Sequence, residues 1–168
     1  MTDNLILIGM PGCGKSTVGV VLAKLLGMRF LDTDLLLQEQ TGKRLPVLLQ
    51  ELGRDGFLSR EAEAICSLRC SGTVIATGGS AVLTEEGAAA LHALGRCIYL
   101  RVPLPALAER LGDLTSRGVA MEPGQSLADL YAERTPCYER CADLIVDEAA
   151  TLEKTALQLA ALVLESSC

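Results

Sequence analysis

One loop limits the folds open to this 168-residue chain more than any other segment, and it reads Gly9-Met10-Pro11-Gly12-Cys13-Gly14-Lys15-Ser16. It fits the pattern G-x-x-x-x-G-K-[ST] in full. An apolar run, Leu5–Ile8, precedes it, and an amphipathic stretch from about Lys15 to Leu26 follows it. Glycines let backbone N–H groups converge on an anion, and the positive end of the helix dipole adds to the attraction. The segment therefore predicts a strand, a phosphate-binding loop and a helix, rather than a glycine-rich turn that matches by chance.

The side chains of this loop predict that ATP and Mg²⁺ are its ligands. Lys15 is a mobile cation that can bridge the β- and γ-phosphates, and the Ser16 hydroxyl can bind Mg²⁺. Thr17 continues the helix and is a further candidate contact, for the α-phosphate. The residues predicted to bind the nucleotide are Gly12, Cys13, Gly14, Lys15, Ser16 and Thr17.

Short apolar segments alternate with amphipathic ones along the rest of the chain. This alternation predicts a parallel sheet covered by helices on both faces, in a single domain over 1–168. The candidate strands are Leu5–Ile8, Arg29–Asp32, Thr73–Thr77, Cys97–Arg101 and Leu144–Asp147. The candidate helices are Lys15–Leu26, Asp34–Gln40, Pro46–Leu52, Gly56–Leu68, Glu85–Leu94, Pro103–Leu111, Ser126–Arg140 and Thr151–Leu164. Residues 112–124 follow no period and predict a mobile loop.

Charge and composition narrow the classes of partner. The net charge of -6 repels phosphate backbones, and 3% aromatic content with no tryptophan leaves little for base stacking, so a nucleic-acid partner is not expected. The first residues carry no basic region, and no apolar run is long enough to cross a membrane. We therefore expect a cytoplasmic monomer that acts on a small molecule.

Seven cysteines are spread along the chain, and two pairs, Cys66/Cys70 and Cys137/Cys141, have i,i+4 spacing. Two thiolates at that spacing on a helix can share a metal ion. Small apolar filling of a helix face is the favoured interpretation, because the single histidine, His92, is not near either pair.

Two carboxylates follow the second candidate strand, in Asp32-Thr33-Asp34. Ligands of open parallel sheets bind beyond the carboxyl ends of the strands, so one of the two aspartates is a candidate for the Mg²⁺ shell and the other for the acceptor hydroxyl. The alternative is that the pair only caps the next helix. Beside a phosphate loop, a functional role is favoured for at least one of them.

Glycines and arginines further along complete the candidate site. Gly78 and Gly79 follow the third strand, where they either let a substrate approach the backbone or form a plain turn. Arg117 can stabilise the transferring charge, Arg134 can bind a carboxylate, and Arg110 can stack on a purine. For any one of these arginines alone, a solvated surface residue is the default interpretation, and Arg60 and Glu61 could simply pair on a helix surface.

Taken in order, these motifs resemble the shikimate kinase family of small P-loop kinases over nearly the whole chain. The resemblance rests on Gly9–Ser16, Asp32-Thr33-Asp34, the Phe57…Glu61 helix, Thr77-Gly78-Gly79, Arg117 and Arg134-Thr135-Pro136-Cys137-Tyr138. It implies a three-layer α/β fold of the P-loop NTPase type, with a five-stranded parallel sheet and a mobile lid at about 112–124. It also implies an ATP- and Mg²⁺-dependent transfer of the γ-phosphoryl group to a hydroxyl of shikimate. By this resemblance Lys15, Asp34 and Arg117 are catalytic, Ser16 and Asp32 serve the metal, Arg110 contacts adenine, and Asp34, Gly78, Gly79 and Arg134 bind the acceptor.

Three positions depart from the family's pattern. Leu58 stands where the family has a second carboxylate-binding arginine, Ser80 replaces a third glycine, and Gly118 replaces a proline after the lid arginine. Arg60 lies two residues further on, which turns it roughly 200° away around a helix. The departures therefore keep a second acceptor open, homoserine or another hydroxy amino acid. A nucleotide-binding regulator without acceptor chemistry is the alternative of another class.

Overall fold

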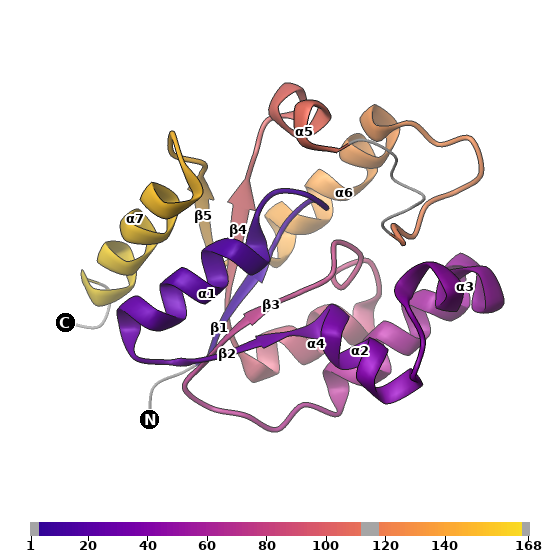
Figure 1. Cartoon of the computed structure of the whole chain (residues 1–168), viewed down its shortest axis with the longest axis horizontal. Coiled ribbons are helices and arrows are strands. Elements are labelled where there is room, and N and C mark those ends of the chain that lie inside the picture. The colour runs from indigo at the N-terminus through magenta and orange to yellow at the C-terminus, as the bar shows by residue number, and fades with distance from the viewer. Residues whose placement is uncertain (1–3, 112–117, 166–168) are drawn as a thin grey trace.

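The computed structural model describes residues 4–111 and 118–165, which build a sheet between layers of helices. The sheet has five strands in the order β2-β3-β1-β4-β5, and every neighbouring pair is parallel (Figure 1). Its strands are β1 (Asn4–Ile8), β2 (Arg29–Asp32), β3 (Thr73–Ala76), β4 (Gly95–Arg101) and β5 (Leu144–Asp147). The predicted α/β class, with five parallel strands between helices, is confirmed.

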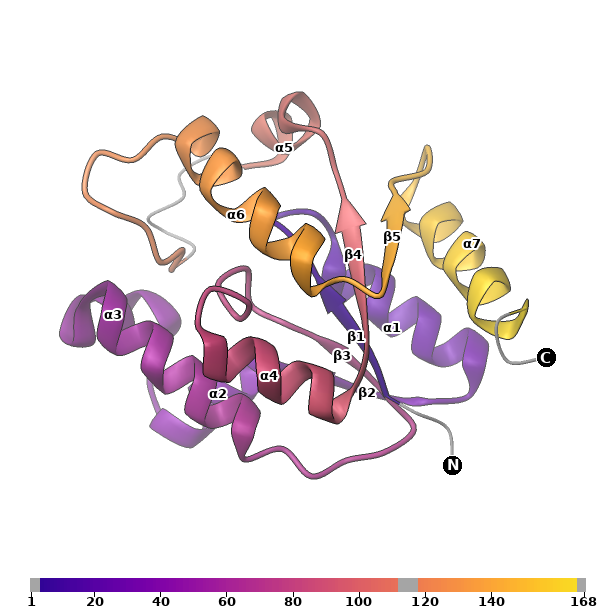
Figure 2. The ribbon, with the colours of Figure 1, turned by 180° about the vertical axis from the view of Figure 1, so that it is seen from behind.

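Helices cover both faces of the sheet. Figure 1 shows α1 (Lys15–Leu26) and α7 (Leu152–Glu165) in front of it. Seen from behind in Figure 2, α4 (Glu85–Leu94) and α6 (Leu127–Cys141) cover the opposite face. The remaining helices are α2 (Thr33–Thr41), α3 (Leu45–Cys66) and α5 (Leu104–Arg110). Because α2 and α3 continue from the edge strand β2, they extend the molecule beyond the sheet and form one side of the site.

The central strand shows why these short segments pair in parallel. All five residues of β1 are buried, as expected for a strand covered on both faces, and Leu7 pairs with Ala76 of β3 and Ile98 of β4. With every strand running the same way, the loops after β1, β2 and β3 meet at one edge of the sheet. This edge, toward which the arrows point in Figure 1, brings the phosphate loop, the two aspartates and the glycine pair together.

Helix α3 corrects the sequence prediction. The chain was expected to form two helices, Pro46–Leu52 and Gly56–Leu68, whereas the structure has one helical element over Leu45–Cys66. The backbone is non-helical only at Gly53, with φ 67° and ψ -179°. A glycine adopts that positive φ without the strain that a Cβ would add. The two predicted helices therefore follow each other directly through a one-residue kink.

Two hydrophobic clusters stabilise this arrangement. The larger one fills both faces of the sheet and includes Leu7, Ile75 and Ile98, none of which is exposed. A smaller cluster lies under the site between α2 and α3, and consists of Leu37, Leu45, Leu48, Phe57, Leu58, Ala64 and Ala120. Within residues 4–111 and 118–165, none of the helices has the length and apolar character needed to cross a membrane.

Candidate active site

A cavity of about 570 Å³ opens at the carboxyl edge of the sheet. Its walls come from the phosphate loop, α2, α3, the loop after β3, the end of α5, α6 and the start of α7. The predicted site residues that line it are Gly12, Gly14, Lys15, Ser16, Thr17, Asp34, Gly78, Gly79, Arg110 and Arg134. Ten residues predicted from separate motifs thus share one cavity.

The phosphate loop has the backbone that its glycines predict. Gly12 and Gly14 have φ values of 75° and 91°, a region that other residues rarely adopt. A Cβ at Gly12 would lie 2.6 Å from the side chain of Leu111, and one at Gly14 would lie 2.5 Å from Leu152. A side chain at either position would therefore collide with a neighbouring residue. The two glycines keep the backbone of the loop open for an anion.

Lys15 begins α1 and folds back over the loop. Its Nζ donates hydrogen bonds of 2.8 Å to the carbonyl oxygens of both Gly9 and Met10, and a longer one of 3.6 Å to Cys13 Sγ. The side chain is only 7% exposed, so the loop itself fixes the direction of the ammonium group. These three hydrogen-bond acceptors are uncharged, so the buried ammonium keeps its positive charge for an incoming phosphate.

Cys13 differs from its neighbours in the loop. Its N–H donates a 3.2 Å hydrogen bond to the carbonyl of Met10, and its side chain is buried in the larger cluster. Cys13 is not among the described residues that line the cavity. The side chain of Cys13 is therefore turned away from the cavity. A nucleotide contact through the backbone of Cys13 stays a prediction.

Ser16 and Asp32 connect the phosphate loop with the end of β2. The Ser16 hydroxyl donates a 2.5 Å hydrogen bond to Oδ2 of Asp32. The other carboxylate oxygen, Oδ1, accepts from the N–H groups of Asp34 and Leu35 and so caps α2. The capping and functional interpretations of Asp32 are therefore compatible, because one oxygen serves each. Oxygen donors from a hydroxyl and a carboxylate suit a hard cation such as Mg²⁺.

Asp34 points into the cavity from the first turn of α2. The pKa of its carboxyl is raised from 3.8 to about 6, mainly by burial and also by the negative charge of Asp32. The ammonium of Lys15 acts in the opposite direction. A carboxylate with a pKa of about 6 is ionised at neutral pH and is basic enough to accept a proton from a hydroxyl.

Glu61 is the buried acid of the site that the sequence analysis did not select. Its side chain lies in the cavity wall, 3% exposed, and Oε2 accepts a 2.5 Å hydrogen bond from the Ser80 hydroxyl. Oε1 is buried without a partner among the described residues. Burial is the main cause that raises the pKa of this carboxyl to about 7. Glu61 lies four residues after the buried Phe57, so both residues lie on the same face of the helix. This spacing is the sequence signal that could have predicted the inward direction of Glu61.

The prediction that Arg60 and Glu61 could pair on a helix surface is wrong. Arg60 instead forms an ion pair with Glu63 at 3.0 Å and does not line the described cavity wall. Leu58 is buried in the smaller cluster and is also absent from that wall. The helix therefore turns Glu61 toward the cavity and Arg60 away from it, so Arg60 does not take the place of a second carboxylate-binding arginine.

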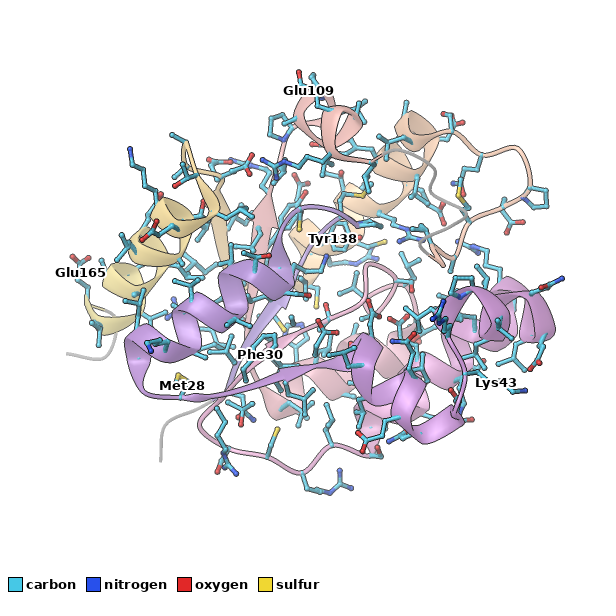
Figure 3. The ribbon with its side chains drawn as sticks, in the orientation of Figure 1. Met28, Phe30, Lys43, Glu109, Tyr138 and Glu165 are labelled. Carbon is cyan, nitrogen blue, oxygen red and sulfur yellow. The ribbon has the colours of Figure 1, made fainter. Side chains whose placement is uncertain are left out.

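Arg134 enters the cavity from α6 and is 1% exposed. One of its terminal nitrogens donates to the carbonyl of Ala120, while Nε is buried without a partner in the described part of the chain. A Cβ added to Gly79 would lie 3.1 Å from the other terminal nitrogen, so this glycine leaves the guanidinium accessible. Tyr138, labelled in Figure 3, donates to the carbonyl of Gly79 and holds that turn against α6.

The two remaining arginines of the predicted site are Arg110 and Arg117. Arg110 lies at the rim of the cavity and forms an ion pair with Glu148. Arg117 lies outside the described residues, as does 112–117 of the predicted lid. Of the rest of that segment, Gly118, Val119 and Ala120 line the cavity, and the last two are buried.

The position of His92 overturns one premise of the sequence analysis. The imidazole was expected to lie away from both cysteine pairs, but it lines the same hollow as Cys137 and Cys141. Cys97 and Asp143 lie beside it. Parallel pairing of β4 with β5 brings these groups together, which spacing along the sequence does not reveal.

Comparisons with known proteins agree with this site. The family model of shikimate kinase matches residues 11–164. A shikimate kinase of Thiobacillus denitrificans is 41% identical over 150 residues, which cover 88% of this chain and 82% of that protein. A shikimate kinase 2 of Yersinia pseudotuberculosis is 36% identical over 160 residues, 90% of each chain.

Solved structures give the same result. The shikimate kinase from Acinetobacter baumannii, determined in complex with shikimate, superposes with a TM-score of 0.89 at 30% identity, over 99% of this chain and 95% of that one. Sequence and fold therefore agree over almost the full length, and the chain belongs to the shikimate kinase family.

Proposed function

We propose that this chain transfers the γ-phosphoryl group of ATP to a hydroxyl of shikimate, with Mg²⁺ as its metal. Membership of the family makes the chain an ATP-dependent kinase of amino-acid biosynthesis. The observation that carries the proposal is that the cavity joins the phosphate loop to Asp34, Glu61 and Arg134. A phosphate cradle, a base and a carboxylate-binding cation are the three parts such a transfer needs.

On the nucleotide side, the donor set fits ATP and Mg²⁺. Lys15 and the N–H groups around Gly12 and Gly14 would hold the phosphates, with Thr17 beside them and Arg110 at the adenine. Ser16 and Asp32 would hold the metal through the oxygens that already meet at 2.5 Å. When bound, Mg²⁺ supplies positive charge that offsets the charge of the phosphates. Arg117 remains proposed as the lid arginine of 112–124.

On the acceptor side, Asp34 would orient the attacking hydroxyl and take its proton. Its pKa of about 6 leaves it ionised at neutral pH, and its burial keeps water from competing for the same oxygen. Arg134 would bind the acceptor carboxylate through the guanidinium that Gly79 leaves accessible. Gly78 and Gly79 would let the acceptor approach the backbone of the loop.

Homoserine or another hydroxy amino acid is not favoured as the acceptor, because the relatives above are shikimate kinases. The regulator without acceptor chemistry is disfavoured on the same ground. The test is release of ADP from MgATP with shikimate, homoserine, serine and gluconate in parallel. Stimulation by shikimate is the expected result. Stimulation by homoserine alone would reassign the acceptor, and none with any compound would support the regulator.

We further propose that the chain works as a cytoplasmic monomer with no nucleic-acid partner. Its net charge of -6 disfavours phosphate backbones. Sedimentation of the purified chain at several concentrations tests the monomer, and a concentration-dependent increase in mass would contradict it.

A further inference from the structure

A second group of chemically reactive side chains lies at the amino-terminal edge of the sheet, where the strand arrows start in Figure 2. His92 is in the last turn of α4, and Cys97 is the third residue of β4. Cys141 ends α6, and Asp143 directly precedes β5. The active-site cavity lies at the opposite edge and contains none of these four residues.

The donor atoms of this group converge. A ring nitrogen of His92, the sulfur of Cys97 and a carboxylate oxygen of Asp143 all lie within 4.8 Å of one another. The thiol of Cys141 interacts electrostatically with Cys97 and His92, and it lines the same hollow as His92. Neither thiol is in a disulfide. Three ligand-type side chains therefore meet around one point, and the thiol of Cys141 is a fourth that lies beside two of them.

The backbone holds this arrangement in place. The N–H of Cys97 donates a 2.7 Å hydrogen bond to Oδ2 of Asp143, and the N–H of Asp143 donates one of 2.8 Å to the carbonyl of Cys97. Cys97 is not exposed and Cys141 is 4% exposed, whereas His92 and Asp143 are exposed. Two buried sulfurs at the base and two exposed side chains at the mouth give a metal ion both an anchor and an entry path.

We propose that His92, Cys97, Cys141 and Asp143 form a structural Zn²⁺ site. Thiolate, imidazole and carboxylate are the donors that zinc takes in tetrahedral sites. With metal–ligand bonds of 2.0–2.3 Å, neighbouring donors in such a site lie about 3.3–3.8 Å apart. For His92, Cys97 and Asp143, the observed limit of 4.8 Å therefore requires a shift of roughly 1 Å, which the exposed imidazole and carboxylate can make. The Cys141 thiol lies outside that group of three and would have to move further to complete the site.

Charge and chemistry separate this site from the phosphate loop. Two thiolates and a carboxylate exceed the charge of Zn²⁺ by one, and Arg140 and Arg96 line the two hollows on either side of His92, where they offset that excess. The phosphate site offers only oxygens from Ser16 and Asp32, which suit Mg²⁺. The bound zinc would join the α4–β4 junction to the α6–β5 junction and stabilise the fold at the edge remote from catalysis.

The test titrates the reduced full chain with Co²⁺, and then with Zn²⁺, in the absence of nucleotide and Mg²⁺. We expect one equivalent of Co²⁺ to give a thiolate-to-cobalt charge-transfer absorption that Zn²⁺ displaces, and Zn²⁺ to raise the Tm. His92→Gln and Cys141→Ser should each weaken binding by roughly tenfold or more. Cys66→Ser removes an exposed thiol elsewhere and should bind the metal as the parent chain does.

Calorimetry with MgATP shows whether each variant is folded, since none of the three changes touches the phosphate loop. Absence of the charge-transfer band in the parent chain would overturn the proposal. So would a band of equal strength and affinity in His92→Gln and Cys141→Ser, because it would assign the metal to other cysteines. Failure of this site would leave the proposed kinase function unaffected, as ADP release reports on the opposite edge of the sheet.

Discussion

The hydroxyl of Ser80 donates a 2.5 Å hydrogen bond to Oε2 of Glu61, so a residue of the loop after β3 fixes a buried acid on α3. The other oxygen of Glu61 faces the cavity region without a partner in the described chain. Burial raises the pKa of Glu61 to about 7, and the hydrogen bond from Ser80 counteracts part of that rise. Ser80 therefore lowers the pH at which this carboxyl changes its charge.

Ser80→Ala should move that pH upward. Loss of the hydrogen bond removes an interaction that favours the ionised form, so the pKa of Glu61 rises further above about 7. The measurement is the pH dependence of kcat/KM for the acceptor, and the apparent pKa near neutrality should increase. A hydrogen bond to a charged group contributes about 1.5–3 kcal/mol, enough for a shift of roughly a pH unit.

Ser59→Ala is the matched control, because Ser59 is exposed on the same helix as Glu61. Its pH profile should superimpose on that of the parent chain. If the Ser80→Ala profile superimposed as well, Ser80 would have no influence on the titration of Glu61.

Glu61→Gln should change how stability depends on pH. The pKa of Glu61 is raised from 4.5 to about 7 on folding, so the folded state binds a proton more tightly than the unfolded state does. The free energy of unfolding of the parent chain should therefore fall as pH rises from about 4.5 to 7, by about 3 kcal/mol from this group. Glutamine keeps the shape and an acceptor for Ser80 but does not titrate, so this part of the fall should disappear.

Urea unfolding between pH 5 and 8 measures the effect as a difference between the two proteins. Glu63→Gln is the control, because Glu63 is exposed and pairs only with Arg60 among the described residues. It should leave the slope of stability against pH unchanged. A constant difference between Glu61→Gln and the parent chain across this range would show that Glu61 does not titrate as a buried acid.

Local signals made much of the fold and the nucleotide side predictable from sequence. The phosphate loop occupies consecutive residues, and its glycines, lysine and serine act through backbone geometry that spacing fixes. Gly27 ends α1 with φ 65°, as expected for a residue just past a helix. In a parallel sheet, strand ends share one edge, so Asp34 and Gly78 could be placed together without knowing any contact.

Contacts between distant segments could not be predicted in the same way. Glu61 and Ser80 are nineteen positions apart, and the direction of Glu61 depends on which face of α3 packs under the site. The meeting of His92 with Cys141 depends on β5 adding beside β4. The sequence did not predict that the helical element continues through Gly53, because glycine is typical both of a helix end and of a kink.

Gly78→Ala should damage the acceptor site without straining the backbone. Gly78 does not have a positive φ, yet a Cβ there would lie 2.2 Å from Oε1 of Glu61 and 2.8 Å from Oδ1 of Asp34. Both carboxyl groups must move, and displacement of a base by about 1 Å costs roughly a hundredfold in kcat/KM. Steady-state kinetics with varied acceptor measures the loss.

Gly56→Ala places the same methyl group on α3 outside the cavity and should leave kcat/KM unchanged. Binding of MgATP to Gly78→Ala should also persist, because the phosphate loop is untouched. Full activity of Gly78→Ala would mean that Asp34 and Glu61 need not keep their present positions for turnover.

Lys15→Ala tests the nucleotide side. The Lys15 ammonium is held over the loop by the carbonyls of Gly9 and Met10, and we expect its loss to lower kcat by roughly 10²–10³-fold, the effect of removing one preorganised charge donor. The loss should be the same with every acceptor, because the phosphates and not the acceptor meet this group. Lys24→Ala, an exposed lysine on the same helix, should behave as the parent chain. If Lys15→Ala kept near-normal turnover while remaining folded, the γ-phosphoryl group would have to be stabilised elsewhere, and the assignment of the phosphate loop would fail with it.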